Sequence, residues 1–447
     1  PADRMKSTAF GPSRKNMVLR SSARPWNSSS NIAQTDMKAL IIGGGIGGLS
    51  AALTLHARGI ETEIFEQSSA LGELGVGINT LPHAIKELAE LGLLEDLIRV
   101  GIQTSELTYA NRLGQTIWQE PRGKAAGYDY PQFSIHRGKL LKVLADAAAM
   151  HGGAPRTGHR FTRFEQGPSS VTAYFDKDGA EVSYQGDLLI GADGIHSSLR
   201  AIFFPGEGPP LWDGVVQWRG AVIKEPWKTG NEMMVAGPRN SKFIYYPISN
   251  DVKEPGKQLV NWTFTIKMAE FGSAMQNSAD WTRIGDRRLL EKYLQEVDFQ
   301  LGSLDPAAII RATDQIFEYP RCDRDPLPYW SRGRVTLLGD AAHAMYPVGS
   351  NGASQAILDA RCLADCLAGS NSAPDAIAAY EDARRPPTTD IIHRNRRGGP
   401  EQVIDLVEER APEGFDRLAD VVSEEELLSI IKGYSTLAGF EKDQVNK

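Results

Sequence analysis

The first apolar run of the chain, at residues 38–42, ends at Gly43. The stretch 39–57 is apolar enough to suggest a membrane span, but it contains five glycines, and a spanning helix needs about 20 mostly apolar residues. The pattern instead predicts a buried strand, a glycine turn and a helix.

Further along, apolar residues recur either at helical spacing or in strand-like alternation. The helical pattern predicts helices over 80–100, 138–150, 286–297, 352–368 and 374–398. The alternating pattern predicts a hairpin within 171–190 that turns at Lys177-Asp178-Gly179, strands over 212–265, and an apolar strand at 335–338.

Composition and charge place these elements in an ordinary globular protein. Hydrophobic residues make up 41% and charged residues 23% of the 447 positions, which argues against a mostly disordered chain. The net charge of −7 makes a nucleic-acid-binding surface unexpected. Three cysteines cannot form a disulfide framework, so we expect a reducing, cytoplasmic location. No other stretch is long enough to span a membrane.

The two ends differ in charge from the middle. Residues 1–36 carry six basic and two acidic side chains and are rich in serine, so we expect a disordered extension; a transit peptide is the alternative. Residues 401–447 carry twelve acidic and five basic side chains. The segment 398–447 is expected to be an acidic tail with one or two amphipathic helices.

The glycine turn carries the first motif of functional interest. Gly43-Gly44-Gly45-Ile46-Gly47-Gly48 fits G-x-G-x-x-G between a predicted strand and a predicted helix, which predicts a dinucleotide site rather than a packing turn. A second strand at 63–66 ends in Glu66, which is placed to accept hydrogen bonds from a ribose. The motif alone leaves FAD and NAD(P) open.

Two later motifs also follow apolar strands. The strand at 187–192 ends in Asp193-Gly194, and the strand at 335–338 ends in Gly339-Asp340. A carboxylate at a strand's carboxyl end lies where ligands bind in open α/β sheets; the alternative for either aspartate is a turn or helix cap. The turn 349–352 opens a helix whose dipole favours negative charge.

These three motifs, in this order, resemble the single-component FAD-dependent aromatic hydroxylases, the group of para-hydroxybenzoate and salicylate hydroxylases. The resemblance covers about 37–397. A closer likeness, to 5-methylphenazine-1-carboxylate 1-monooxygenase, is a subfamily hint only. It rests on Leu74–Asn79, Ser134–Gly138, Trp218–Gly220 and Asp323–Pro328. One departure is Gly72-Glu73, where many members carry an arginine.

The resemblance implies an α/β fold with a Rossmann-like FAD-binding domain, 37–211 and 326–397, and an inserted, mainly antiparallel β-sheet substrate domain, 212–325. It implies non-covalent FAD, NADH or NADPH and O₂ as co-substrates, and oxygen transfer from a flavin C4a-hydroperoxide to a small aromatic or heteroaromatic compound. Decarboxylation, and a monomer or a homodimer, stay open. Epoxidation, flavin oxidase or dehydrogenase activity, and a non-catalytic flavin-binding interaction protein are the alternatives.

The motifs and the resemblance together give the expected site. The expected cofactor residues are Gly43, Gly45, Ile46, Gly47, Gly48, Glu66, Gln67, Gly77, Arg137, Asp193, Gly339, Asp340, Ser350, Asn351 and Gly352. The expected substrate residues are Trp218, Arg219, Tyr246, Pro347 and Gly349, of which Tyr246 and Pro347 are the catalytic candidates. Arg219 has a surface or interdomain ion pair as its alternative role, and His343 is expected to be structural. The eight histidines are scattered, so no metal site is expected.

A chain beginning at Met37 should bind FAD and turn over like the full chain. Residues 1–36 show no apolar period and cannot bury enough surface to offset the entropy of ordering. FAD content and turnover of the two proteins, compared side by side, check this; loss of folding on truncation would contradict it.

Overall fold

The computed structural model describes residues 37–72, 75–151, 153–275 and 283–447, so the predicted extension at 1–36 lies outside the described residues. Within them, no helix is long and apolar enough to cross a membrane. The first sheet has the strand order β17-β18-β11-β1-β2. Its strands are β1 (Lys38–Ile42), β2 (Glu61–Phe65), β11 (Leu188–Gly191), β17 (Ser331–Arg332) and β18 (Val335–Leu337).

Four of these strands run parallel, and only β17 is antiparallel to its neighbour β18. The apolar runs in the sequence predict that these strands are buried. Parallel strands that are covered on both faces appear in a sequence as continuous hydrophobic stretches. Parallel pairing brings the carboxyl ends of β1, β11 and β18 to one edge, and each of the three sequence motifs follows one of these ends.

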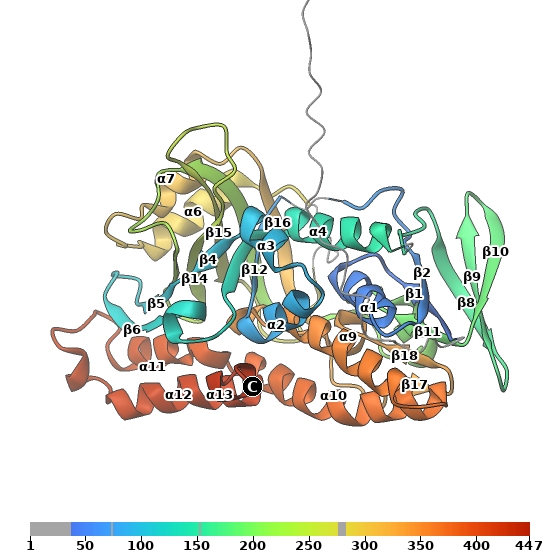
Figure 1. Ribbon diagram of the computed structural model, residues 1–447. Helices are drawn as coiled ribbons and strands as arrows, with labels where there is room; N and C mark the ends of the chain where they lie inside the picture. Colours follow the sequence, from blue (N-terminus) through green and yellow to red (C-terminus); the bar gives the residue numbers. More distant parts are fainter. Residues whose placement is uncertain (1–36, 73–74, 152, 276–282) are drawn as a thin grey trace, which may run out of the picture. The chain divides into compact units, whose positions relative to one another are not determined.

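Helices lie on this sheet or pack on the helices that do (Figure 1). They are α1 (Ile46–His56), α4 (Arg137–Met150), α5 (Ser198–Phe203), α8 (Asp340–His343), α9 (Gly352–Ala368) and α10 (Ala373–Arg396). The glycine-rich start of α1 lets it approach closely: a Cβ on Gly47 would lie 3.1 Å from the Leu338 side chain. Thr54 also donates a hydrogen bond across to the Ala360 carbonyl of α9 at 3.1 Å.

The predicted single helix over 80–100 is two helices, α2 (Pro82–Glu90) and α3 (Leu94–Val100). Gly92 separates them with φ of +74°, a left-handed conformation that a continuous helix excludes. The predicted hairpin is confirmed as β9 (Val171–Lys177) and β10 (Ala180–Gly186), with β8 (Arg160–Gln166) as a third strand.

The second large sheet has seven strands in the order β16-β12-β15-β14-β13-β5-β6. They are β5 (Glu106–Ala110), β6 (Thr116–Pro121), β12 (Leu211–Lys224), β13 (Glu232–Ala236), β14 (Ser241–Ser249), β15 (Gln258–Lys267) and β16 (Ile316–Asp323). Only the pairing of β13 with β5 is parallel, so the predicted α/β class with a mainly antiparallel sheet is confirmed. Strands β5 and β6, however, come from the stretch assigned to the FAD-binding part. Both strands are short, and β6 is half-exposed, so their residues give no clear alternating pattern that would predict strands.

A small sheet connects the two large ones. It has the order β3-β7-β4, formed by β3 (Gly77–Thr80), β7 (Gln132–His136) and β4 (Ile102–Thr104). A Cβ on Gly77 would lie 2.6 Å from the ring of Tyr246 on β14. Glycine at this position therefore allows β3 to lie directly against the seven-stranded sheet.

The seven-stranded sheet is covered on both faces. One face packs on α6 (Arg287–Val297) and α7 (Pro306–Arg311), around a core that includes Trp218 and Trp262. The predicted acidic tail covers part of the other face with α11 (Gln402–Arg410) and α12 (Glu424–Leu437), drawn in red in Figure 1. The tail ends in α13 (Lys442–Val445), and short 3₁₀ turns lie at Gly123–Ala126, Val348–Ser350, Gly399–Glu401 and Leu418–Asp420.

A buried ion pair attaches the tail to the sheet. The Lys242 Nζ of β14 lies 2.6 Å from Glu401 Oε2 and 3.7 Å from Asp405 Oδ1. Lys242 and Glu401 are both buried. Removing one partner of such a pair leaves a buried charge without compensation.

Lys242→Met should therefore lower the free energy of unfolding by about 3–5 kcal/mol. Glu401→Gln in the same chain should recover much of the loss, because it removes the uncompensated carboxylate. Urea unfolding measures both, with Lys142→Met, in an exposed pair with Asp146, as the matched control. An equal, small effect of Lys242→Met and Lys142→Met would contradict the expectation.

Candidate active site

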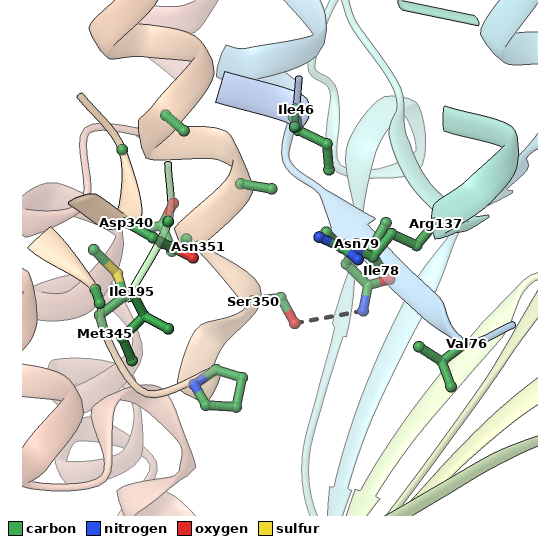
Figure 2. Close-up of a pocket in the computed structure, with 18 of the residues that line it drawn as sticks. Ile46, Val76, Ile78, Asn79, Arg137, Ile195, Asp340, Met345, Ser350 and Asn351 are labelled. Carbon is green, nitrogen blue, oxygen red and sulfur yellow. Dashed lines mark hydrogen bonds between the residues drawn. The ribbon is translucent and has the colours of Figure 1, made fainter. Parts of the chain in front are cut away.

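A cavity of about 430 Å³ is lined both by the carboxyl edge of the parallel sheet and by strands of the seven-stranded sheet. Figure 2 shows part of this lining, with Asp340, Asn351 and Met345 on one side and Ile46, Arg137 and Val76 on the other. Of the predicted site residues, the cavity brings together Gly45, Ile46, Gly47, Gly77, Arg137, Arg219, Tyr246, Gly339, Asp340, Pro347, Ser350, Asn351 and Gly352.

Some glycines of the loop at 43–48 allow close packing of the backbone, and one leaves the cavity open. Gly43 has φ of +104°, and a Cβ there would overlap the Ala192 carbonyl; a Cβ on Gly48 would overlap the Gly43 carbonyl. By contrast, a Cβ on Gly45 would have no atom within 4 Å, so this position is open on the cavity side. No side chain caps the first turn of α1, so its amides are free to bind phosphate oxygens.

Glu66 accepts a hydrogen bond from the backbone of the same loop. Its Oε2 accepts a hydrogen bond from the Gly44 amide at 2.9 Å, and its Oε1 accepts one from the Ser68 amide at 2.8 Å. Neither Glu66 nor the exposed Gln67 lines the cavity, and their predicted contacts with a ribose stay predictions.

Asp340 and Arg137 bring opposite charges to the cavity. Asp340 follows Gly339 at the end of β18, and Arg137 begins α4 directly after β7. Asp340 is exposed to the open cavity, but the surrounding protein still desolvates its carboxylate and raises its pKa, an effect that the nearby His343 and Arg137 oppose. Burial likewise lowers the pKa of Arg137, which Asp340 opposes.

A buried polar network holds the backbone of Gly339, the residue before Asp340. Asp359 of α9 accepts hydrogen bonds from the Gly339 amide at 3.1 Å, from His343 Nε2, and from Arg384 Nε at 2.7 Å. Burial alone would raise the pKa of Asp359, but His343 and Arg384 hold it at about 2. His343 therefore pairs with a buried carboxylate rather than lining the cavity, as a structural histidine does.

The loop between Tyr346 and Gly352 forms a third wall. Pro347, Ser350, Asn351 and Gly352 line the cavity, and α9 begins there without a side-chain cap. The Asn79 amide donates a hydrogen bond to Ser350 Oγ at 3.4 Å, the contact dashed in Figure 2. Asn351 is fully buried, and its Nδ2 has no partner.

Like Gly43, Gly48, Glu66 and Gln67, three further predicted residues do not line the cavity. Trp218 points to the other face of its strand, where it is fully buried and donates to Glu318 Oε2 at 2.9 Å, so the expected substrate contact is wrong. Gly349 faces Tyr434 instead of the cavity: a Cβ there would lie 2.5 Å from the tyrosine hydroxyl. Asp193 caps α5 by accepting from the Ser198 amide at 2.7 Å, and its neighbours Gly194 and Ile195 line the cavity in its place.

Sequence reasoning missed Asn79, Gln217, Thr263, Phe317 and Tyr319 in the cavity wall. Gln217 and Arg219 flank Trp218 on β12, and successive strand residues point to opposite faces. Had Arg219 alone been assigned to the site, strict alternation would have predicted Gln217 and excluded Trp218.

Arg219 donates only to neutral oxygens. Its Nη2 lies 2.6 Å from the Gly77 carbonyl and 3.3 Å from both Tyr246 Oη and Asn261 Oδ1, and its Nη1 lies 3.1 Å from Tyr319 Oη. Its buried Nε has no partner. Burial lowers the pKa of Arg219, but the two tyrosines outweigh this and raise it. Burial raises the pKa of Tyr246, an effect that Arg219 opposes. At neutral pH the cluster therefore holds one positive charge and protonated Tyr246.

These features fit a dinucleotide, which is a long and partly anionic ligand. Gly45, Asn351 and the uncapped starts of α1 and α9 all lie along the cavity edge. Within the described ranges, no group of three or more His, Cys, Asp or Glu side chains could hold a metal ion.

Comparisons with known proteins agree with this geometry. A family model described as FAD binding domain matches residues 36–293 and 310–395. Phenazine 1,6-dicarboxylic acid hydroxylase PhzS of Lysobacter antibioticus is 42% identical over 81% of this chain and 89% of the relative. A salicylate hydroxylase of Pseudomonas putida is 30% identical over 80% of this chain and 83% of the relative.

Solved structures support the fold. The structure of Klebsiella pneumoniae HpxO complexed with FAD and uric acid has a TM-score of 0.69 at 24% identity, covering 92% of this chain and 97% of the other. The chain belongs to the FAD-binding-domain family. Within that family it is one of the FAD-dependent aromatic hydroxylases, so the predicted family and the predicted FAD are confirmed.

Asp340→Ala should weaken FAD binding by about 1.5–3 kcal/mol for each charge-assisted hydrogen bond that the carboxylate makes to the cofactor. The Kd for FAD, titrated into the apoprotein, measures the loss. Asp365→Ala, which removes an exposed carboxylate on α9 that pairs with Arg58 and Arg361, is the matched control and should bind like the parent. An unchanged Kd for Asp340→Ala would remove this carboxylate from the cofactor site.

Proposed function

We propose that this protein uses NADH or NADPH and O₂ to hydroxylate a small, planar aromatic or heteroaromatic compound that carries a carboxylate. The observation that carries the proposal is the uncompensated charge of Arg219 in the cavity wall, where its four hydrogen-bond acceptors are all neutral. Among the described residues, no carboxylate forms an ion pair with it.

A buried cation is costly unless a paired charge compensates for it. A substrate carboxylate would supply that charge, and a guanidinium binds carboxylates with planar geometry and charge-assisted hydrogen bonds. The two relatives support this choice, because one is named for a phenazine dicarboxylic acid and the other for salicylate.

The walls around Arg219 suit a flat ring. Ile244, Tyr246, Phe317 and Tyr319 line the cavity from neighbouring strands of the sheet. Aromatic and aliphatic faces bind planar rings by stacking and apolar contact. The ring would therefore lie between the sheet and the loop at Pro347, with its carboxylate toward Arg219.

FAD, when bound, supplies the activation of O₂ and accepts electrons from the nicotinamide. The chain's own residues have the other tasks. Gly45, Asp340 and Asn351 would hold FAD, while Arg219 orients the substrate. Tyr246 is protonated at neutral pH, as tyrosines ordinarily are, and burial raises its pKa further; it would donate a hydrogen bond to a substrate hydroxyl. Pro347 shapes the opposite wall and keeps water from the ring. Whether oxygen insertion also removes the carboxylate depends on where that group sits on the ring.

A panel of aromatic acids, their amides and phenols, and fused heterocyclic acids tests the function. Substrate-stimulated oxidation of NADH or NADPH, with a hydroxylated product identified by mass spectrometry, supports it. An epoxide product would favour the epoxidase alternative, and no stimulation by any compound would favour a flavin-binding protein without turnover.

Arg219→Met should raise KM or Kd for aromatic acids by a factor that corresponds to about 1.5–3 kcal/mol, the contribution of a charged hydrogen bond. Arg219→Lys, which keeps the charge, should lose less. The neutral amide of the same acid is the internal control, since its binding does not depend on the charge. Equal losses for acid and amide would contradict the assignment of Arg219 to the carboxylate.

A further inference from the structure

We propose that Tyr434, in the C-terminal segment, is a positioning residue for the FAD-binding loop at 347–352. Tyr434 lies on α12, is 1% exposed, and lines no part of the cavity. Its contacts, described below, fix the backbone of the loop from the side opposite to the cavity.

The tyrosine hydroxyl connects three parts of the chain. It lies 3.2 Å from the Val348 carbonyl and 3.0 Å from Asn395 Oδ1, so its one hydrogen is offered to both acceptors. The amide of Asn395 in turn donates to the Tyr346 carbonyl at 3.1 Å. The carbonyls on both sides of Pro347 are thus held by buried side chains from α10 and α12.

The tyrosine ring meets the loop where its backbone is least favourable. Gly349 has φ of +69° and Ser350 has φ of +55°, two consecutive left-handed residues of which one is not glycine. Such conformations persist only where the surroundings enforce them. A Cβ on Gly349 would lie 2.5–2.7 Å from Oη, Cζ and Cε1 of Tyr434, so the ring packs directly on this backbone. Ser350, the next residue, lines the cavity.

A second contact from the same segment reaches the end of the loop. Gln355 Nε2 donates to the Ala438 carbonyl at 3.1 Å and to Asn351 Oδ1 at 3.2 Å. Arg384 Nη2 donates to Gln355 Oε1 at 2.6 Å. The position of Asn351, which lines the cavity, therefore also depends on Ala438 in the same C-terminal segment as Tyr434.

A different role would be to fasten the C-terminal segment in place without affecting the loop. The chain offers a matched control for that role, because Tyr128 Oη donates to the Phe440 carbonyl at 2.6 Å. Tyr128 touches the same segment but not the loop. Tyr434→Phe and Tyr128→Phe each remove one hydroxyl that joins the segment to the body of the protein.

The test measures Kd for FAD on the apoprotein of the full chain, without substrate, together with the midpoint potential of the bound flavin and the melting temperature. Tyr434→Phe should raise Kd for FAD about tenfold, as expected for one or two lost hydrogen bonds, and should shift the potential. Tyr128→Phe should change neither. A Kd within twofold of the parent for Tyr434→Phe, or equal changes in both variants, would overturn the proposal.

A double-mutant cycle tests the packing contact independently. Gly349→Ala should weaken FAD binding strongly in the parent, because its Cβ meets the Tyr434 ring, and at least tenfold less in a Tyr434→Ala chain. The strain of alanine at φ of +69° cancels in this comparison. Additive effects would overturn the proposal. If Tyr434→Ala does not fold, the Tyr434→Phe comparison still decides, and neither measurement depends on which substrate the protein hydroxylates.

Discussion

The parallel pairing of β1, β11 and β18 is the constraint on which the rest of the site depends. In this register Ile42 lies beside Gly191, and Gly191 lies beside Leu337, so the three strands end at one level. The residues that follow each end must then share a narrow edge. Gly43 is held there by its amide, which donates to the Phe65 carbonyl at 2.7 Å, and any side chain at 43 would overlap Ala192. Within the first motif, Gly43 therefore allows the strands to end together, and its neighbours Gly45, Ile46 and Gly47 line the cavity.

The other large sheet contributes charge and shape rather than phosphate binding. Alternation along β12 directs Trp218 into the core and Gln217 and Arg219 toward the cavity. One strand thus supplies both a core residue of the fold and the residue that we propose binds the substrate. The closeness of β3 to this sheet, which glycine at position 77 permits, brings the Gly77 carbonyl within 2.6 Å of the guanidinium. Neutral oxygens position Arg219 without neutralising it, and its charge stays available to an anionic ligand.

The sequence predicts the local parts of this arrangement well and the non-local parts poorly. The glycine loop, the strand-end aspartate Asp340 and most helix bounds follow from short patterns of propensity and burial. To exclude Trp218 from the site, one must know which face of β12 its side chain lies on. That face depends on the pairing of β12 with β15 and β16. Strands β5 and β6 join a sheet whose other members begin about a hundred residues later, a pairing that no local pattern encodes. The motif predicts that Gly349 belongs to the site. The structure shows that a side chain at 349 would overlap Tyr434, which lies 85 positions further along the chain.

That last contact changes how the acidic tail is understood. The family model matches residues only up to 395, and α11 and α12 lie beyond it. Yet these helices bury Val403, Ile404 and Val407 against the sheet and place Tyr434 under the loop. Most acidic side chains account for the charge of the segment, whereas its apolar side chains and the buried Glu401 account for its position. Because loop 347–352 contains two left-handed residues and has cavity on one side, its support must come from the other side. In this chain that side is formed by α10 and α12, so part of the support for this cavity-lining loop lies beyond the residues that the family model matches.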